Sequence, residues 1–177
     1  MQNEGRTNEI KLRESVSSTS EARRVLAGAG EVVLVTRGKP RNLAMKCPCG
    51  CNEVIIVNVD PRAGPAWRVY LRKGKLSVYP SIWKESGCKS HFIISENNIW
   101  WCDRFEEDYS FSAYDAQLQE AILNQLGYED LVAFEELAKT IDEVPWIILV
   151  VCRDLVKKNL LKEGLAERRG SFVRVAP

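Results

Sequence analysis

The sequence predicts an α+β protein in which a small β-rich domain precedes a smaller domain of helices and a hairpin. Three observations lead to this fold class. Runs rich in β-branched and aromatic residues fill much of residues 31–101, as they do in strands. After residue 115 the apolar residues recur with a helical period. Cysteines gather beside proline and glycine in the β-rich part, which is typical of a small domain built around a metal ion.

The composition is that of an ordinary globular protein. The chain of 177 residues has 45% apolar and 28% charged residues, so a fully disordered or fibrous protein is excluded. With 25 basic and 24 acidic residues the formal net charge is +1. This balance argues against a protein that coats nucleic acid or an anionic membrane.

The first residues are predicted to be a flexible leader. Residues 1–19 are polar and contain a cluster of serines. They have no apolar core of a secretory signal, and the longest apolar run of the chain, Val144–Cys152, is too short to span a membrane. We therefore expect a cytoplasmic protein. In that compartment the six cysteines are expected to be metal ligands or core thiols rather than disulfides.

The predicted β-rich domain extends over residues 20–104. A short helix begins it, with Ser20 as a possible cap and Gly28 and Gly30 at its end. Strands are then predicted at 31–37, at 42–47 and at 53–60. Two hairpins follow, across Lys73–Gly74 and across Glu96–Asn98.

A linker and a second domain complete the chain. Residues 105–114 are acidic and irregular and are predicted to be the linker. Residues 115–177 are predicted to form three helices, at 116–127, 133–141 and 145–161, and a terminal hairpin at 165–175. This order of helices and hairpin resembles a winged helix.

Two short clusters predict a zinc site. Cys47-Pro-Cys49-Gly-Cys51 is followed by Cys88-Lys-Ser-His91, and zinc is held by four thiolates or imidazoles in a tetrahedron. A three-residue hairpin loop at Pro48–Gly50 would make Cys47 and Cys51 cross-strand neighbours. The preferred ligands are therefore Cys47, Cys51, Cys88 and His91, with Cys49 as the substitute. Buried free thiols fit poorly with three cysteines in one turn.

The single histidine forces a choice between two functions. As a zinc ligand, His91 is unavailable as a general base, and a Ser-His or Cys-His hydrolase built from this chain would then lack a histidine base. If His91 is free, Ser81, Ser90 or a spare thiol can be the nucleophile. A catalytic zinc would need a carboxylate base such as Glu53 or Glu85, and neither lies in a known motif. Structural zinc is the default.

The segment from Asp60 to Arg68 contains residue types common at binding surfaces. Proline and glycine make it a turn, and Arg62, Trp67 and Arg68 are typical contact residues. The preferred interpretation is a surface loop with Trp67 turned into the core and the arginines solvated, because interface composition is a weak signal.

The region from Gly30 to Cys102 resembles a bacterial family of unknown function. Its members carry a Cys-Pro-x-Gly-Cys turn, a Pro-Ser-Ile/Val segment and Cys-x-Ser-His-Phe, and this chain has all three, with Asn52 where many members have glycine. Such members are often encoded beside ubiquitin-like modifiers and their activating and conjugating enzymes. The resemblance implies that Cys47, Cys51, Cys88 and His91 hold the metal, and that Ser81 is the serine of the Pro-Ser-Ile segment.

The resemblance thus implies a zinc-binding accessory of ubiquitin-like conjugation, with the modifier or its enzymes as partners. The enzyme alternative is a peptidase that matures or removes the modifier with Ser81 and His91 or with zinc. A zinc-stabilised DNA regulator is the third hypothesis. Nucleic acid is the less favoured partner, because residues 115–177 hold 8 basic and 11 acidic residues, a net charge of −3. The candidate recognition helix, Pro145–Lys158, also begins with apolar residues.

Overall fold

The computed structural model of the chain describes residues 5–104 and 116–176. It divides into two compact units, Met1–Tyr109 and Ser110–Pro177, and each is described here by itself. Helices and sheets occur together, so the predicted α+β class is confirmed. The predicted linker at residues 105–114 lies outside the described residues.

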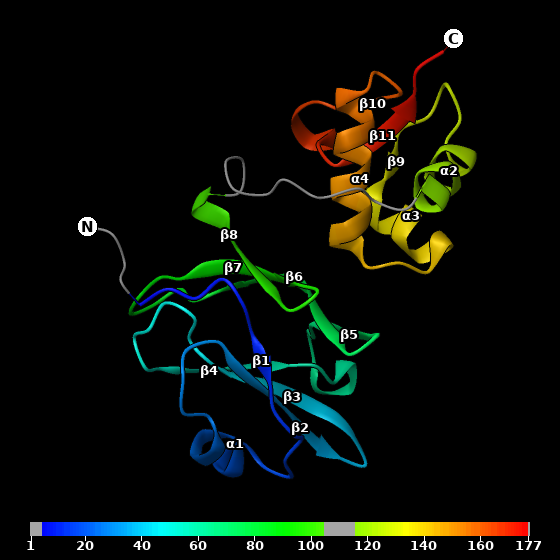
Figure 1. Cartoon of the computed structure of the whole chain (residues 1–177). Helices are drawn as coiled ribbons and strands as arrows, with labels where there is room; N and C mark the ends of the chain where they lie inside the picture. The colour runs from blue at the N-terminus through cyan, green and yellow to red at the C-terminus, as the bar shows by residue number, and fades with distance from the viewer. Residues whose placement is uncertain (1–4, 105–115, 177) are drawn as a thin grey trace. The chain divides into compact units, whose positions relative to one another are not determined.

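Two four-stranded sheets make up the first unit (Figure 1). One sheet has the order β1 (Lys11–Leu12), β2 (Glu31–Arg37), β3 (Lys39–Lys46) and β4 (Val54–Asn58). The other has the order β5 (Arg68–Arg72), β6 (Lys75–Trp83), β7 (His91–Ser95) and β8 (Asn98–Trp101), all antiparallel. The predicted strands are present, and β6 continues through Pro80 to Trp83.

The core of this unit lies between the two sheets. Leu43 and Met45 of β3 and Phe92 and Ile94 of β7 belong to one buried cluster. Alternate residues of β2 and β3, such as Val33 and Ala44, instead form a second cluster with α1 (Thr19–Val25). This division follows from the period of two in a strand, which sends neighbouring side chains to opposite faces. Ser18, rather than Ser20, caps α1 by accepting a hydrogen bond from the Glu21 N–H.

The prediction of a flexible leader at residues 1–19 is wrong for much of its described part. Lys11 and Leu12 pair in parallel with Glu31 and Val32, and Ile10 is buried in the core. The Ile10 N–H also donates to the carbonyl of Asn97, in the turn between β7 and β8 of the other sheet. Apolar residues at alternate positions 10 and 12 explain the difference, because both pack against the core between the sheets.

The second unit consists of three helices and a three-stranded sheet. In chain order it contains α2 (Ala116–Gln125), β9 (Val132–Ala133), α3 (Phe134–Ile141), α4 (Pro145–Lys157), β10 (Leu161–Glu163) and β11 (Ser171–Arg174). The sheet order is β10-β11-β9. The predicted third helix is too long and the predicted hairpin starts too late, because Leu161 already pairs with Arg174. Strand β9 has no counterpart in the prediction.

Short 3-10 helices complete the described chain, at Pro61–Ala63, Cys102–Arg104 and Ala166–Arg168. Most of the apolar first turns of α4 are buried, including Trp146, Ile148 and Leu149. Within the described residues, no helix has the length and apolar character needed to cross a membrane.

Candidate functional site

Strand pairing places Ser81 and His91 on the same face of the second sheet. Trp83 pairs with His91 and Ile82 with Phe92, and the next pair is Val78 with Ile94. Strand β6 therefore carries two extra residues here, which form a bulge that includes Ser81; the Tyr79–Pro80 peptide is cis. Ile82 and Phe92 point into the core, so Trp83 and His91 point outward. Ser81 precedes Trp83 by two residues and shares its face.

The two side chains are joined by a hydrogen bond. The His91 Nε2 atom lies 3.0 Å from the Ser81 Oγ atom, a distance suitable for proton transfer from the hydroxyl to the imidazole. His91 is exposed and Ser81 is half-buried. The Trp83 ring lies beside the imidazole, with 5.9 Å between centroids. Across the part of the chain that the structure describes, no carboxylate hydrogen-bonds to His91, so the pair is a dyad.

Trp67 supports the backbone of the serine. Its Nε1–H donates to the Ser81 carbonyl oxygen at 3.2 Å, and its ring packs against the core between the sheets. Trp67 is thus turned towards the core, and the same ring also orients the segment that carries Ser81.

The cysteine-rich turn joins β3 to β4 and is longer than predicted. Lys46 pairs with Val54, and the Cys47 N–H donates to the Glu53 carbonyl. Cys51 therefore lies within the loop rather than opposite Cys47 on a neighbouring strand. The longer loop folds back on itself, which brings Cys49 to 3.3 Å from Cys47, measured between Sγ atoms.

Four thiols form one cluster. The Sγ atoms of Cys47, Cys49, Cys51 and Cys88 all lie within 4.8 Å of one another, and those of Cys47 and Cys88 are 3.7 Å apart. A tetrahedral zinc site with Zn–S bonds of about 2.3 Å has sulfur atoms about 3.8 Å apart. The donor set and its spacing therefore fit a metal ion that prefers thiolates.

Ser90 connects this cluster to the strand that carries His91. Its Oγ atom lies 3.2 Å from the Cys88 Sγ atom and 3.6 Å from the Cys47 Sγ atom, and the residue is 4% exposed. The Ser90 carbonyl accepts a hydrogen bond from the Lys84 N–H. The loop between β6 and β7 is held at both of these points.

The environments of the thiols differ. Burial raises the pKa of Cys47 far above its usual range and also raises the pKa of Cys51. Burial acts in the same direction on Cys88, but hydrogen bonds from Ser90 and its neighbouring thiols lower the pKa of Cys88 to about 6. Since a metal binds thiolates, loading the cluster releases protons and is opposed by acid.

The structure brings Cys49 to the other three thiols and does not bring His91 there. Ser90 points to the cluster, and the adjacent His91 points the other way, as successive residues entering a strand do. The preferred sequence-based ligand set, with His91 in place of Cys49, thus differs from the group in the structure. A metal site made of four thiols does not need the His91 imidazole, which therefore remains available to Ser81. A metal site and a Ser-His pair, which the sequence presents as exclusive, are thus compatible. The Glu53 carboxylate forms an ion pair with Lys84.

Most of the first unit matches a known family. Residues 7–102 match the family model described as bacterial ubiquitination-like system serine protease, BubE. The chain belongs to the BubE family. The matched residues include Ser81, His91 and all four clustered cysteines. No curated protein and no solved structure matches the chain.

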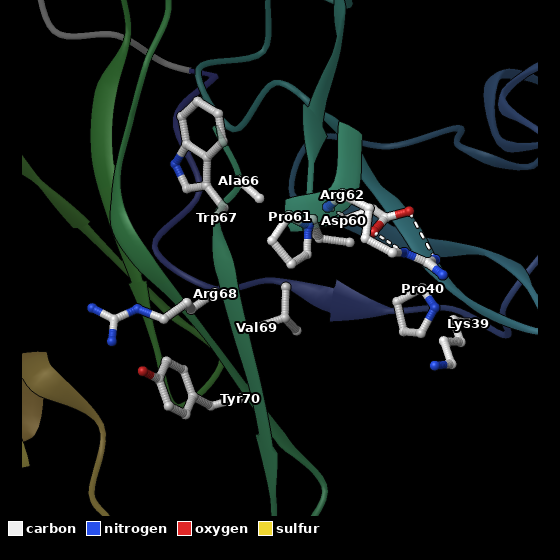
Figure 2. A pocket seen from close by; sticks show the side chains of 11 residues that line it. Lys39, Pro40, Asp60, Pro61, Arg62, Ala66, Trp67, Arg68, Val69 and Tyr70 are labelled. Atoms are coloured by element: carbon white, nitrogen blue, oxygen red, sulfur yellow. Dashed lines mark hydrogen bonds and ion pairs between the residues drawn. The ribbon is translucent and has the colours of Figure 1, made fainter. Parts of the chain in front are cut away.

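Two pockets flank Trp67 in this BubE-family unit. The first, here named the Trp83 pocket, has a volume of about 400 Å³ and is lined by Ile55, Ile56, Val57, Asn58, Trp67, Ile82, Trp83, Lys84, Glu85 and Ser86. The second, named the Asp60 pocket (Figure 2), has a volume of about 620 Å³ and is lined by Lys39, Pro40, Val59, Asp60, Pro61, Arg62, Ala66, Trp67, Arg68, Val69 and Tyr70. Ser81 is joined to their shared wall through the Trp67 indole.

Replacement of Asp60 by Asn is expected to lower thermal stability at neutral pH, and to do so less in acid. The Arg62 guanidinium holds the pKa of the Asp60 carboxyl well below its usual range. Because the pKa is lowered in the folded state, the stabilisation is complete above about pH 4 and is lost as the pH falls below that value. Thermal unfolding of both proteins over a pH series measures the effect.

The matched control is Asp103→Asn, since Asp103 forms an exposed ion pair with Arg6 and such pairs contribute little. A difference between Asp60→Asn and the unaltered protein that stays constant with pH would contradict this account of Asp60.

Proposed function

We propose that this BubE-family chain is a serine peptidase that matures or removes a ubiquitin-like modifier, with Ser81 as nucleophile and His91 as general base. One observation carries the proposal: the 3.0 Å contact between the Ser81 Oγ and His91 Nε2 atoms on an outward face of the sheet. The sequence alone favours a non-catalytic accessory. The free imidazole and the family membership favour the enzyme.

The dyad can carry out both halves of an acyl transfer. His91 Nε2 accepts the hydroxyl proton as Ser81 Oγ attacks the carbonyl carbon of the scissile bond. The imidazolium then donates this proton to the leaving amine, and the C–N bond breaks to leave an acyl-enzyme. In the second half, His91 takes a proton from water, the resulting hydroxide adds to the ester carbon, and Ser81 leaves with the proton.

The Trp83 pocket supports a polypeptide substrate. Strand β5 pairs with β6 only as far as Arg68 with Tyr79, so the end of β6 that carries Ser81 extends beyond its neighbour. The pocket begins at this edge, and its walls include Ile55, Val57, Ile82 and the exposed ring of Trp83. An extended chain with an apolar side chain next to its scissile bond suits such a groove.

We assign a structural zinc ion to the four clustered thiols. Thiolates are the ligands that zinc prefers, and four of them complete its tetrahedron without a water molecule. The four thiols would hold such an ion between the loop that joins β3 to β4 and the loop that ends at His91. The ion would supply a structural link that positions the base, and the cleavage itself is assigned to Ser81 and His91.

The second unit is proposed to be a winged-helix domain that docks a protein of the same pathway. Its order of helix, strand, two helices and two strands is the order expected of that fold. The apolar start of α4 is buried, so it does not offer the polar side chains that read DNA bases. The modifier or its activating and conjugating enzymes are the partners that the family membership favours.

A fluorophosphonate probe tests the catalytic assignment directly. The full-length protein is expected to gain one probe adduct, located on Ser81 by peptide mass spectrometry, because His91 makes this hydroxyl nucleophilic. Ser81→Ala and His91→Ala should lose the adduct. The matched control is Ser20→Ala, which removes an exposed helical serine of the same unit. An adduct on another serine, or labelling retained by His91→Ala, would refute the dyad.

A further inference from the structure

The Asp60 pocket is separate from the dyad, since neither Ser81 nor His91 lines it. It opens between the start of β3 and the edge strand β5. Figure 2 shows Lys39, Pro40 and Pro61 on one side of it, and Trp67 and Val69 from the β5 segment on the other. The walls are largely apolar, and the charged residues of the lining are Lys39, Asp60, Arg62 and Arg68. The Arg68 guanidinium lies over the Tyr79 ring.

One buried carboxylate organises the charges. Asp60 is 3% exposed, and its oxygens accept hydrogen bonds from Arg62 Nε at 2.8 Å and Arg62 Nη2 at 3.0 Å. Arg41 forms an ion pair with the same carboxylate. Asp60 is also fixed through its backbone, since its N–H donates to Asn58 and its carbonyl accepts from Asn58 Nδ2. The guanidinium of Arg62 is therefore held in one orientation.

This arrangement leaves positive charge and hydrogen-bond donors at the pocket. One carboxylate is shared by two guanidinium groups, so one positive charge is not neutralised. The bonds from Arg62 to Asp60 occupy the Nε edge, and the edge formed by Nη1 and Nη2 still offers donors to a second carboxylate. Lys39 is exposed, and the structure gives it no ion-pair partner within the described ranges 5–104 and 116–176.

The pocket is joined to the nucleophile by a single side chain. Trp67 lines the Asp60 pocket and the Trp83 pocket, and its indole N–H donates to the Ser81 carbonyl. Trp67 therefore connects the backbone of Ser81 to a wall of the Asp60 pocket. A neighbouring residue of the substrate is thus the ligand best placed to enter.

We infer that the Asp60 pocket binds an acidic side chain of the polypeptide substrate, with Arg62 and Lys39 as the residues that select it. The inference rests on the proposed peptidase function and adds its specificity. An aspartate or glutamate carboxylate would accept from the free Nη1–Nη2 edge of Arg62 while the apolar walls cover its methylene groups. A glutamine of the same size would lose the ion pair.

Binding to an array of matched decapeptides tests the inference without cleavage. The probe is full-length Ser81→Ala protein, and paired peptides differ by one Glu-for-Gln exchange. Peptides with Glu at the favoured position should be retained about tenfold better than their Gln partners, the change expected for one charge-assisted hydrogen bond. Arg62→Gln and Lys39→Gln, each made in the Ser81→Ala protein, should each reduce this preference. Arg62→Lys should restore part of it.

The control for the loss of one positive charge is Arg23→Gln, on the exposed face of α1, which should behave like the parent. The Lys39→Gln variant tests the pocket even if Arg62→Gln disturbs the fold, because Lys39 is not bonded to Asp60. Equal retention of Glu and Gln peptides would overturn the inference. An unchanged preference for Glu in both pocket variants would also overturn it. So would a protein that binds inorganic phosphate but retains neither the Glu nor the Gln peptides.

A parallel assay separates this inference from the proposed function. The wild-type protein is given the retained peptides in internally quenched form. Glu-dependent retention without cleavage by the wild-type protein would refute the peptidase and leave the acid-binding pocket in place. Cleavage at Ser81 without a preference for Glu in binding or in kcat/KM would overturn the pocket and leave the peptidase.

Discussion

Ser81→Ala is expected to reduce kcat/KM for cleavage of a modifier fusion about ten-thousand-fold or more. The substitution removes the atom that would form the acyl-enzyme, and losses of this size or larger follow removal of a catalytic serine or histidine. His91→Ala should have a similar effect, since an isolated serine hydroxyl is a weak nucleophile. The variant with both substitutions should cleave no more slowly than the less active of the two single variants, because the two residues act as one unit.

Single-turnover cleavage of the ubiquitin-like modifier fused to a C-terminal reporter measures these effects. The fold should survive both changes, because Ser81 is only half-buried and His91 is exposed. Circular dichroism of each variant checks this. Ser20→Ala is the control with unchanged activity. A reduction of less than about tenfold by either variant of the dyad would contradict the mechanism, since general-base catalysis alone contributes at least about a hundredfold.

Loss of the proposed zinc ion is expected to destabilise the first unit and to abolish the proposed cleavage. The four thiols come from two loops that are about forty residues apart in the chain, so an ion between them closes a long loop. Cys47→Ser should abolish zinc binding and lower the unfolding midpoint by about 10 °C or more. Each kcal/mol of lost stability lowers the midpoint of a protein of this size by about 2–4 °C, and loss of the ion should cost a few kcal/mol. Cleavage should fall as well, since Ser90 and His91 follow the cluster directly.

Elemental analysis and thermal unfolding of the untagged protein measure this prediction. About one zinc ion per chain is expected in the wild-type protein. Cys102→Ser is the matched control: Cys102 lies outside the cluster, and burial raises the pKa of its thiol to about 11, which disfavours the thiolate that a metal needs. A Cys47→Ser protein with normal zinc content and an unchanged midpoint would refute the structural site.

His91→Ala separates the two candidate roles of the histidine. If His91 belongs to the dyad alone, the variant should keep its zinc and its unfolding midpoint while losing cleavage. If it is a ligand, zinc content should fall together with activity. The separation between the Ser81 contact and the four-thiol group favours the first result.

Much of the local organisation could be predicted from short-range patterns. Runs of β-branched residues locate β2, β4 and β7, because such residues favour the extended backbone of a strand. Glycines and asparagines mark the turns that join β5 to β6 and β7 to β8, where Lys73, Glu96 and Asn97 have positive φ values. The spacing of the cysteines likewise identifies their chemistry, since thiols in turns can converge on a metal.

Other features depend on contacts between distant segments, and local pattern contains no information about these. The polar N-terminal segment is held by β2 and by Asn97 of the other sheet. The role of Trp67 depends on a hydrogen bond to Ser81, fourteen residues further along. The Asp60 pocket exists only because the edges of the two sheets face each other there.

The α+β class, the strand-rich first part and the residues from which both sites are built could be predicted from the sequence. The division of those residues between the two sites follows from the tertiary structure. The length of the loop between β3 and β4 admits Cys49 to the cluster. The alternation of side chains at the start of β7 turns Ser90 to the thiols and His91 to Ser81. Both depend on strand register, which is set by packing of the whole core against the pleated sheets.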